Sequence, residues 1–256
     1  MGPGPPVSTI VTGAGRGIGA AVARLLAARG TPVALLDVDG GAAARTAASL
    51  GPGAVGLGVD VTDAAALEQA CDEAAAALGP VDALANVAGV LRTGSVAGLT
   101  DDDWAACLAT NATGVMHACR AVARRWTAAP PPDGGAIVTV ASNAAGVPRA
   151  GMAAYAASKA AALAVTRCTG LELAALGVRA NVVCPGSTDT AMLAGMPAAP
   201  SALVAGTPES FKLGIPLGRV ADPDDVAGTV AFLLSDAARH VTLQTLYVDG
   251  GASLGP

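Results

Sequence analysis

The sequence predicts one α/β domain built on a doubly wound, parallel sheet of about seven strands, with helices on both faces. Short apolar runs rich in β-branched residues alternate along the chain with longer, alanine-rich helical segments, which is the pattern of parallel βαβ units. The first apolar run leads into a glycine-rich turn and then a helix, the arrangement that opens many such sheets. The 256 residues suit one large domain, and no break in the alternation indicates a second.

The first half of the chain contains four expected strands, each followed by a helix. The strands are predicted at Val7–Thr12, Val33–Asp37, Val55–Val59 and Asp82–Asn86. The helices are predicted at Ala20–Arg29, in the alanine-rich stretch up to Leu50, at Ala64–Leu78 and at Asp101–Thr127. Glycines that follow the helical segments, such as Gly30 and Gly79, are typical helix terminators.

The second half continues the alternation, with one interruption. Strands are predicted at Ala136–Ala141, Val178–Cys184 and Thr242–Val248, and helices at Ala153–Leu176 and Pro223–Ser235. The interruption is Met192–Leu213, which is rich in Pro, Ala and Gly; such a long irregular connection indicates a functional lid or a disordered segment, and we expect a substrate lid at about 189–214. Residues 1–6 are expected to be a flexible lead, and residues 7–256 a single domain.

Composition excludes several function classes. Hydrophobic residues make up 52% of the chain but aromatic residues only 2%, so the core must consist of Ala, Val and Leu. The net charge of −5 and the lack of a basic run argue against a nucleic-acid partner. No apolar run is long enough to span a bilayer and no apolar signal region opens the chain, so we expect a cytoplasmic protein. Five scattered cysteines without a CxxC pair and two isolated histidines indicate reduced thiols and no metal site.

Tyr155 and Lys159 are the most informative pair of residues in the chain. There are only two tyrosines and two lysines against thirteen arginines, so a lysine at 159 suggests a role that arginine cannot fill. Four residues make about one helical turn, which puts both side chains on one face. A phenol titrates near ~10, and a nearby ammonium lowers that pKa. The pair predicts a proton-transfer site, although a YxxxK spacing by itself more often reflects a partly buried tyrosine beside a surface lysine.

The glycine-rich turn Thr12–Gly19 predicts a dinucleotide site. Its glycines allow the backbone to approach a pyrophosphate at the N-terminus of a helix, and the expected contacts are Gly13, Arg16, Gly17, Ile18 and Gly19. Asp37, followed by Val38, ends the next strand. A carboxylate there accepts the ribose hydroxyls of NAD and repels the 2′-phosphate of NADP. Arg16 argues for NADP, but Asp37 is expected nearer the 2′ position, so the sequence favours NAD.

Two later strand ends complete the predicted cofactor site. Asp60 and Val61 follow the third strand and are placed against the adenine, with a helix cap by Thr62 or Asp63 as the alternative. Asn86, Ala88 and Gly89 follow the fourth strand as NVAG, where small residues let the backbone come close to a cofactor; a plain turn is an equally good explanation of this motif alone.

Taken together, the chain resembles the short-chain dehydrogenase/reductase family. TGAGRGIG, NVAG, Asn111, Ser142, YxxxK and Pro185-Gly186 follow that family's order over Val7–Gly251, with Val87 departing from the commoner NAAG. The resemblance implies a Rossmann-type fold and a role for each catalytic residue. Tyr155 is the general acid/base, and Lys159 lowers its pKa and binds the nicotinamide ribose. Ser142 orients the reacting oxygen, and Asn111 holds a water that links Lys159 to solvent.

Five further stretches are similar to a narrower group, the 2,3-dihydro-2,3-dihydroxybenzoate dehydrogenases of siderophore biosynthesis. They are AGVLRTG, IVTVASNAAGVPRAGMAAYAASKAA, NVVCPGSTDTAM, FKLGIPLGR and VTLQTLYVDGGASLG. This resemblance implies oxidation of a ring C3 hydroxyl with NAD, followed by aromatisation. It also implies a homotetramer in which the helices at 101–127 and 153–176 pair across a two-fold axis.

Several residues are candidates for binding such a substrate. Arg149 suits a carboxylate, and Arg92 is the second candidate; a solvated surface arginine is the alternative for each. Gly151 and Met152 are expected to form a wall near the ring. Lys212, the other lysine, is expected to anchor the lid or an interface, with the substrate carboxylate as its alternative partner.

Thr188 and Thr190 follow Pro185-Gly186 and are expected to reach the nicotinamide carboxamide. The alternative is that Ser187, Thr188 and Asp189 cap the first helical turn of the lid.

Four competing functions remain open on the sequence alone. A dehydrogenase of 2,3-dihydro-3-hydroxyanthranilate would use the same residues, because no residue separates an amine from a hydroxyl at C2. A ketoacyl-type reductase using NADPH is disfavoured by Asp37 and by the closer motif matches, and another short-chain alcohol dehydrogenase or ketoreductase is a further alternative. A dinucleotide-binding sensor without catalysis is compatible with the fold but not with four competent catalytic positions.

Overall fold

The computed structural model describes residues 8–195, 199–208 and 212–254. The expected lead at 1–6, Val7 of the first predicted strand, and residues 196–198 and 209–211 of the predicted lid lie outside the described residues. A single seven-stranded sheet of parallel strands has the order β3-β2-β1-β4-β5-β6-β7, which confirms the predicted fold class. The strands are β1 (Ser8–Thr12), β2 (Val33–Asp37), β3 (Ala54–Gly58), β4 (Val81–Asn86), β5 (Ala136–Val140), β6 (Arg179–Pro185) and β7 (Thr245–Val248).

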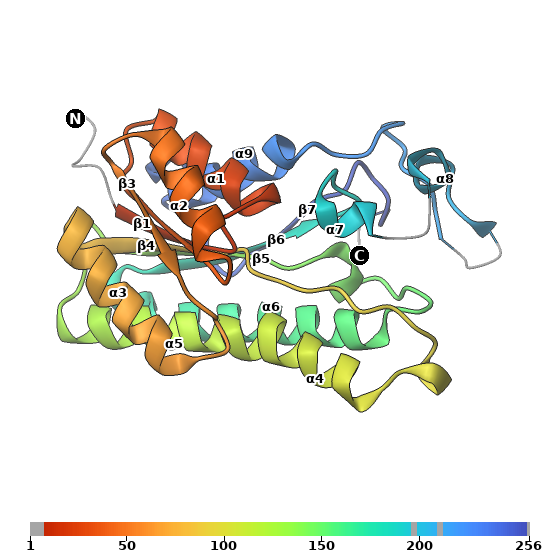
Figure 1. Cartoon of the computed structure of the whole chain (residues 1–256), viewed down its shortest axis with the longest axis horizontal. Helices are drawn as coiled ribbons and strands as arrows, with labels where there is room; N and C mark the ends of the chain where they lie inside the picture. Colours follow the sequence, from red (N-terminus) through yellow and green to blue (C-terminus); the bar gives the residue numbers. More distant parts are fainter. Residues whose placement is uncertain (1–7, 196–198, 209–211, 255–256) are drawn as a thin grey trace.

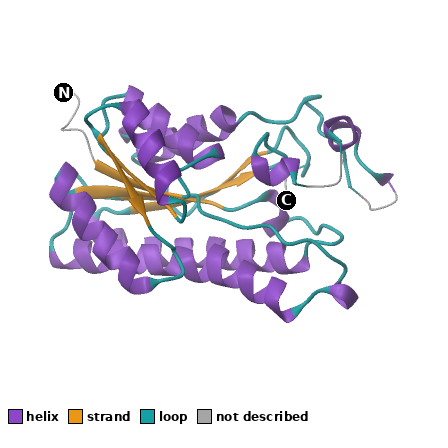
Figure 2. Cartoon of the chain, in the orientation of Figure 1, coloured by secondary structure: helices purple, strands orange, loops and turns teal. Residues whose placement is uncertain are grey.

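Helices cover both faces of the sheet (Figures 1 and 2). One face carries α1 (Gly17–Ala28), α2 (Gly40–Leu50) and α9 (Pro223–Leu234). The other carries α3 (Ala64–Leu78), α4 (Asp101–Leu108), α5 (Gly114–Ala128) and α6 (Ala153–Leu173). Two short helices, α7 (Ala191–Ala194) and α8 (Pro200–Ala205), follow β6 and lie together at one end of the molecule, beyond the sheet.

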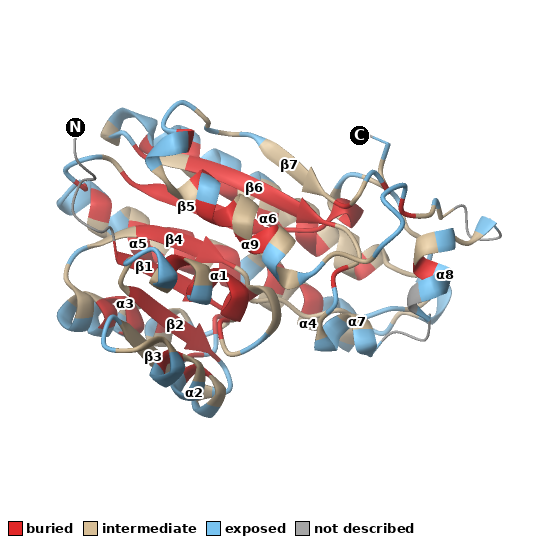
Figure 3. Ribbon diagram, turned by 90° about the horizontal axis from the view of Figure 1, so that it is seen from above, coloured by how far each residue is buried: buried red, intermediate tan, exposed pale blue. Residues whose placement is uncertain are grey.

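The core forms two layers, one on each side of the sheet. Alternate residues of the central strands point to opposite faces, so Ile10 and Leu36 belong to the layer under α3 and α5, whereas Val11 and Leu35 belong to the layer under α1 and α9. β1, β2 and β5 are buried along their whole length (Figure 3), which explains why they read as continuous apolar runs rather than as alternating ones.

Some predicted element limits need correction. The helix predicted at Asp101–Thr127 is interrupted by a π-helical segment at Ala109–Thr113 between α4 and α5. The change from α-helix to π-helix is a change in backbone hydrogen bonding, which the composition of the segment does not indicate. The last strand begins at Thr245 rather than at Thr242, because Leu243 adopts a left-handed φ of 60° as its N–H bonds the Ala180 oxygen at 2.7 Å.

The order of the strands determines where a ligand site forms. From β1 the chain first runs outward to β2 and β3 and then returns to β4 on the other side of β1. Loops after β1 and β4 therefore diverge at the carboxyl edge of the sheet and leave a crevice between them, which is where open α/β sheets bind ligands. The glycine-rich turn, Asp37 and the NVAG motif all follow strands that end at this edge.

Candidate active site

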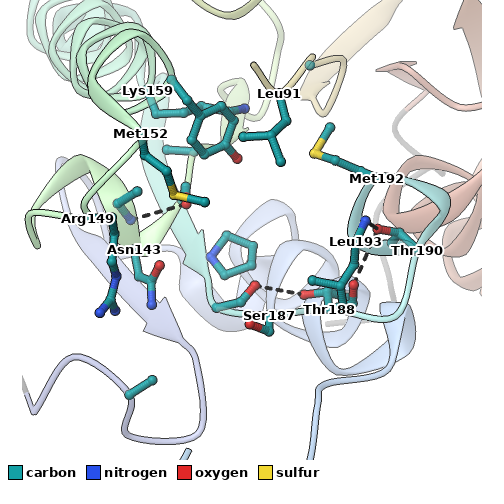
Figure 4. A pocket seen from close by; sticks show the side chains of 18 of the residues that line it. Leu91, Asn143, Arg149, Met152, Lys159, Ser187, Thr188, Thr190, Met192 and Leu193 are labelled. Atoms are coloured by element: carbon teal, nitrogen blue, oxygen red, sulfur yellow. Dashed lines mark hydrogen bonds between the residues drawn. The ribbon is translucent and has the colours of Figure 1, made fainter. Parts of the chain in front are cut away.

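A cavity of about 450 Å³ opens at the carboxyl edge of the sheet, next to α7 and α8 (Figure 4). Its walls come from the first turn of α1, from the loops after β4, β5 and β6, from the start of α6, and from the irregular segment between β6 and α9. The predicted site residues in its lining are Ile18, Gly89, Ser142, Arg149, Met152, Tyr155, Lys159, Pro185, Gly186, Thr188 and Thr190. Residues far apart in the sequence thus converge on one space.

Tyr155 and Ser142 form the polar pair of this cavity. Tyr155 lies in the first turn of α6, and Ser142 follows β5 and is 8% exposed. Burial raises the pKa of the Tyr155 phenol, while its hydrogen bond with the Ser142 side chain lowers it. The Ser142 hydroxyl oxygen also accepts from the Ala144 N–H at 3.2 Å, which fixes its position. The pair can hold a substrate oxygen and exchange a proton with it.

Lys159 is buried, with only 4% of its surface exposed, and its Nζ donates to the Val140 carbonyl at 3.0 Å. Burial lowers the pKa of this ammonium to about 8. The sequence predicts that Lys159 lowers the pKa of Tyr155. In the structure burial raises the pKa of Tyr155, and Lys159 is not one of the groups that shift it. A Cβ at Gly89 would lie only 3.1 Å from this Nζ, so the loop after β4 packs directly against the lysine.

Asn111 is fully buried in the π-helical segment. Its side-chain oxygen accepts from the Val90 N–H at 2.8 Å, and its amide nitrogen donates to the Val90 carbonyl at 2.9 Å and to the Ser158 hydroxyl at 2.9 Å. The side chain therefore ties the loop after β4 to α6, which carries Tyr155 and Lys159. The water-relay role of Asn111 stays a prediction.

The glycine-rich turn has the features of a phosphate-binding loop. A Cβ at Gly13 would meet the Ala88 Cα at 2.7 Å, and a Cβ at Gly19 would meet the Gly13 oxygen at 2.1 Å, so only glycine permits this packing. No side chain caps the N-terminus of α1. Its first N–H groups therefore remain available to an anion, and the positive end of the helix dipole adds to the attraction. Arg16 is exposed beside this turn.

Asp37 sits beside the glycine-rich turn, 7% exposed. Its two carboxylate oxygens accept from the Gly15 N–H at 2.9 Å and from the Asp39 N–H at 3.0 Å. A carboxylate has about four acceptor positions, so it retains capacity for ribose hydroxyls. These residues fit a dinucleotide. Val38, in contrast, is 73% exposed and its side chain contributes little enclosure.

Three cofactor candidates are held by local contacts outside the cavity lining. Asp60 accepts from the N–H and hydroxyl of Thr62, and Asp63 caps α3, as the alternative interpretation expects. Val61 packs in the core. Asn86 is buried and donates to the Thr139 hydroxyl at 3.1 Å, so its side chain joins two strands.

The two arginine candidates for the substrate are placed differently. Arg149 lines the cavity. Burial lowers the pKa of its guanidinium, and the charge of nearby Asp249 partly offsets this lowering. Arg92 is not in the cavity lining, and its Nε pairs with Asp103 at 3.3 Å on the surface. Gly151 is also outside the lining; its carbonyl accepts from the Gly94 N–H at 2.9 Å. The geometry therefore favours Arg149 over Arg92.

Lys212 also lines the cavity, and burial, followed by the charge of Arg149, lowers the pKa of its ammonium. Its backbone is paired in both directions with Thr207, at 2.8 and 3.1 Å. Arg149 and Lys212 have no salt-bridge partner within the described part of the chain. Two cations therefore border one cavity, with Asp249 as the acidic neighbour.

Sequence reasoning missed several lining residues. Asn143 directly follows Ser142 at the end of β5, and that adjacency was an available signal. The larger apolar lining residues that were missed include Leu91, Met192, Leu193, Leu203, Leu213 and Ile215. Most of these lie in the irregular segment, where no periodicity shows which side chains turn inward. α7 is capped by Thr190, whose hydroxyl accepts from the Leu193 N–H at 3.4 Å, rather than by Ser187, Thr188 or Asp189.

Two features are absent from the described ranges 8–195, 199–208 and 212–254. None of their helices is long and apolar enough to cross a membrane. No group of three or more His, Cys, Asp or Glu side chains among these residues could hold a metal ion.

Comparison with known proteins places the chain in a family. The family model described as enoyl-(acyl carrier protein) reductase matches residues 13–253. The chain is 45% identical over 251 residues to 2,3-dihydro-2,3-dihydroxybenzoate dehydrogenase of Bacillus subtilis (strain 168), covering 96% of this chain and 95% of that protein. It is 44% identical over 248 residues to the Escherichia coli (strain K12) protein of the same name, covering 96% of each.

The fold comparison agrees. The crystal structure of 3-ketoacyl-(acyl-carrier-protein) reductase from Brucella melitensis, complexed with NADH, matches with a TM-score of 0.85 at 28% identity, covering 96% of this chain and 98% of that one. The chain belongs to the short-chain dehydrogenase/reductase family of oxidoreductases.

Proposed function

We propose that the protein oxidises the ring C3 hydroxyl of 2,3-dihydro-2,3-dihydroxybenzoate with NAD, and that the product aromatises to 2,3-dihydroxybenzoate. The observation that carries the proposal is that Tyr155 and Ser142 share one cavity with the cationic side chains of Arg149 and Lys212. Relatives at 44–45% identity bear the name of that activity.

The chemistry follows from the polar pair. Ser142 donates a hydrogen bond to the reacting hydroxyl oxygen and orients it, and Tyr155 takes the proton from that oxygen. NAD, when bound, supplies the hydride acceptor. Lys159 favours the phenolate that forms on Tyr155, because an ammonium stabilises a nearby anion even when burial opposes ionisation.

The cofactor preference rests on Asp37 and on the uncapped N-terminus of α1. The free N–H groups of α1 suit the pyrophosphate. Asp37 accepts ribose hydroxyls and repels a 2′-phosphate, because both groups would be anionic at the same place. The cavity lining includes Pro185, Gly186, Thr188 and Thr190, which we expect to contact the nicotinamide.

The substrate side combines charge with an apolar surface. Arg149 and Lys212 outnumber the single carboxylate of Asp249, so an added carboxylate improves the charge balance, and arginine can hold it through two parallel hydrogen bonds. On the opposite wall, Met192 and Leu193 face Arg149 across the space (Figure 4). An apolar ring that carries one carboxylate fits a cavity with a cationic wall on one side and an apolar wall on the other.

Assembly, lid and location complete the proposal. We infer a cytoplasmic homotetramer in which α4, α5 and α6 pair with the same helices of neighbouring copies, since their alanine-rich surfaces permit close approach.

The irregular segment between β6 and α9 contributes Leu203, Lys212, Leu213 and Ile215 to the cavity lining. This placement supports a lid that excludes water from the reacting oxygen.

The test is to mix the purified protein with NAD and trans-2,3-dihydro-2,3-dihydroxybenzoate and to follow NADH absorbance and the catechol product together. We expect both to form in equal amounts. Three comparison reactions are needed: the 2-amino analogue with NAD, a neutral cyclohexadiene diol with NAD, and a 3-oxoacyl thioester with NADPH. Faster turnover of the neutral diol or of the thioester would contradict the proposal.

A further inference from the structure

We propose that the side-chain oxygen of Asn143 accepts a hydrogen bond from a donor group on the ring carbon next to the reacting hydroxyl, so that the site selects vicinal diols and amino alcohols over simple alcohols. This inference rests on the proposed oxidation of a ring hydroxyl and deepens it.

The orientation of the Asn143 amide follows from its buried partner. Asn143 is 9% exposed, and its Nδ2 donates to the Asp249 Oδ2 at 3.2 Å. Asp249 is 8% exposed and also accepts from the Gly251 N–H at 3.0 Å and from the Ser253 hydroxyl at 2.5 Å. An ionised carboxylate only accepts hydrogen bonds. The amide nitrogen must therefore face Asp249, and the amide oxygen must face the other way.

The freed oxygen faces the cavity. Asn143 is one of its lining residues, and Figure 4 shows the carboxamide oxygen turned toward the interior of the drawn ring of side chains. Within the described residues, the hydrogen bonds of Asn143's side chain involve only its nitrogen. The buried side-chain atoms without a partner in the described residues are the Asn86 Oδ1 and the Arg120 Nε, so the Asn143 oxygen is accessible from the cavity and can accept from a ligand or from water. The chain thus holds a hydrogen-bond acceptor, fixed in direction, in the wall of the site.

Its place in the wall defines what it recognises. Ser142, the residue before it, holds the reacting oxygen together with Tyr155, and Arg149 lies on the same wall as Asn143. The wall therefore presents, within eight residues of the chain, a hydroxyl for the reacting oxygen, an acceptor and a cation. A ring acid with a hydroxyl or amine between its reacting hydroxyl and its carboxylate offers the complementary groups in the same order.

The test uses saturated ring acids, which report on hydrogen bonding without aromatisation. The kcat/KM with NAD is measured for trans-2,3-dihydroxycyclohexane-1-carboxylate, for 3-hydroxycyclohexane-1-carboxylate, and for the 2-fluoro-3-hydroxy analogue. Fluorine resembles a hydroxyl in size and electron withdrawal but donates no hydrogen bond. We expect the wild type to prefer the diol about threefold to tenfold, the range for one neutral hydrogen bond, and to treat the fluoro compound like the simple alcohol.

The variant Asn143→Ala should lose the preference for the diol, so that the ratio of kcat/KM for the diol to kcat/KM for the simple alcohol falls to about one. Ser253→Ala is the matched control: it removes another hydrogen bond to Asp249 but lies outside the cavity lining, so it should keep the preference. A diol preference that is equal in the wild type and in Asn143→Ala would overturn the inference.

The fluoro compound keeps the inference testable if Asn143→Ala does not fold, because it needs only the wild type. If that compound is oxidised as fast as the diol, no donor is being recognised. Failure of the proposed function has a different signature, since the wild type would then fail to oxidise the unsaturated dihydrodiol acid as well as the three saturated acids.

Discussion

The ammonium nitrogen of Lys159 lies 5.9 Å from the centroid of the Tyr155 ring and donates a hydrogen bond to the Val140 carbonyl at 3.0 Å. The lysine is thus fixed to the end of β5, the strand that precedes Ser142. Both residues project from one turn of α6 into the cavity. This relationship ties the proposed proton transfer at the phenol to a buried cation.

Replacing Tyr155 by Phe should lower turnover by about two to four orders of magnitude, the usual loss for a general base. The ring remains and fills the same space, so the affinity for NAD should be unchanged. Steady-state kinetics with NAD titrations by fluorescence would check both. Turnover within tenfold of the wild type would show that another group takes the proton.

Lys159→Arg should be severely impaired although it keeps the positive charge. The site is closed around the ammonium, which is 4% exposed and close to Gly89 and the Val140 carbonyl, and a planar guanidinium is larger and rigid. The measurements are kcat, which reports the loss of activity, and the melting temperature, which shows whether the variant is folded. Wild-type kcat in this variant would refute the specific need for lysine.

The free energy of unfolding should increase as the pH rises, because Lys159 is buried. Burial lowers the pKa of this group from 10.5 to about 8, so between these values the unfolded chain binds the proton and the folded chain does not. Stability therefore rises with pH across this window, and the cost of the buried charge is fully present below about 8. The melting temperature of the wild type should increase relative to Lys159→Met between pH 8 and 10.5. A constant difference would argue against a lowered pKa.

NAD should be strongly preferred over NADP, and Asp37→Ser should narrow the preference. The charge repulsion at the 2′-phosphate disappears, while the serine hydroxyl can still accept from the Gly15 N–H that Asp37 now binds at 2.9 Å. The ratio of kcat/KM for the two cofactors is the measurement. If the wild type uses both equally, the selectivity resides elsewhere, and Arg16 is the next residue to change.

Arg149→Ala should raise KM for the dihydrodiol acid about tenfold to a hundredfold, as expected for a charge-assisted bidentate contact, with little change in NAD affinity. Arg92→Ala is the matched control, because Arg92 pairs with Asp103 outside the cavity. An effect of Arg92→Ala alone would place the carboxylate site near α4. No effect of either variant would leave an NAD-dependent alcohol dehydrogenase of unknown substrate.

The sequence alone predicted the sheet and most of its strands and helices, and it singled out Ser142, Tyr155 and Lys159, which the structure brings together in one cavity. Periodicity and glycine placement depend on local backbone geometry, so the bounds of β2 and α3 were predictable to the residue, whereas for α2 only the end at Leu50 was predicted. The motifs around Gly13, Ser142 and Tyr155 were readable for the same reason, since each occupies a short stretch beside a strand end.

Only the tertiary structure decided which side chains share the cavity. It separated Arg149, which lines the cavity, from Arg92, which Asp103 neutralises at the surface. It turned the Asn143 oxygen toward the cavity, because Asp249, 106 residues away in the chain, accepts the hydrogen bond from the amide nitrogen. The physical reason is that ion pairing, burial and amide orientation depend on contacts between distant segments, which no local pattern encodes.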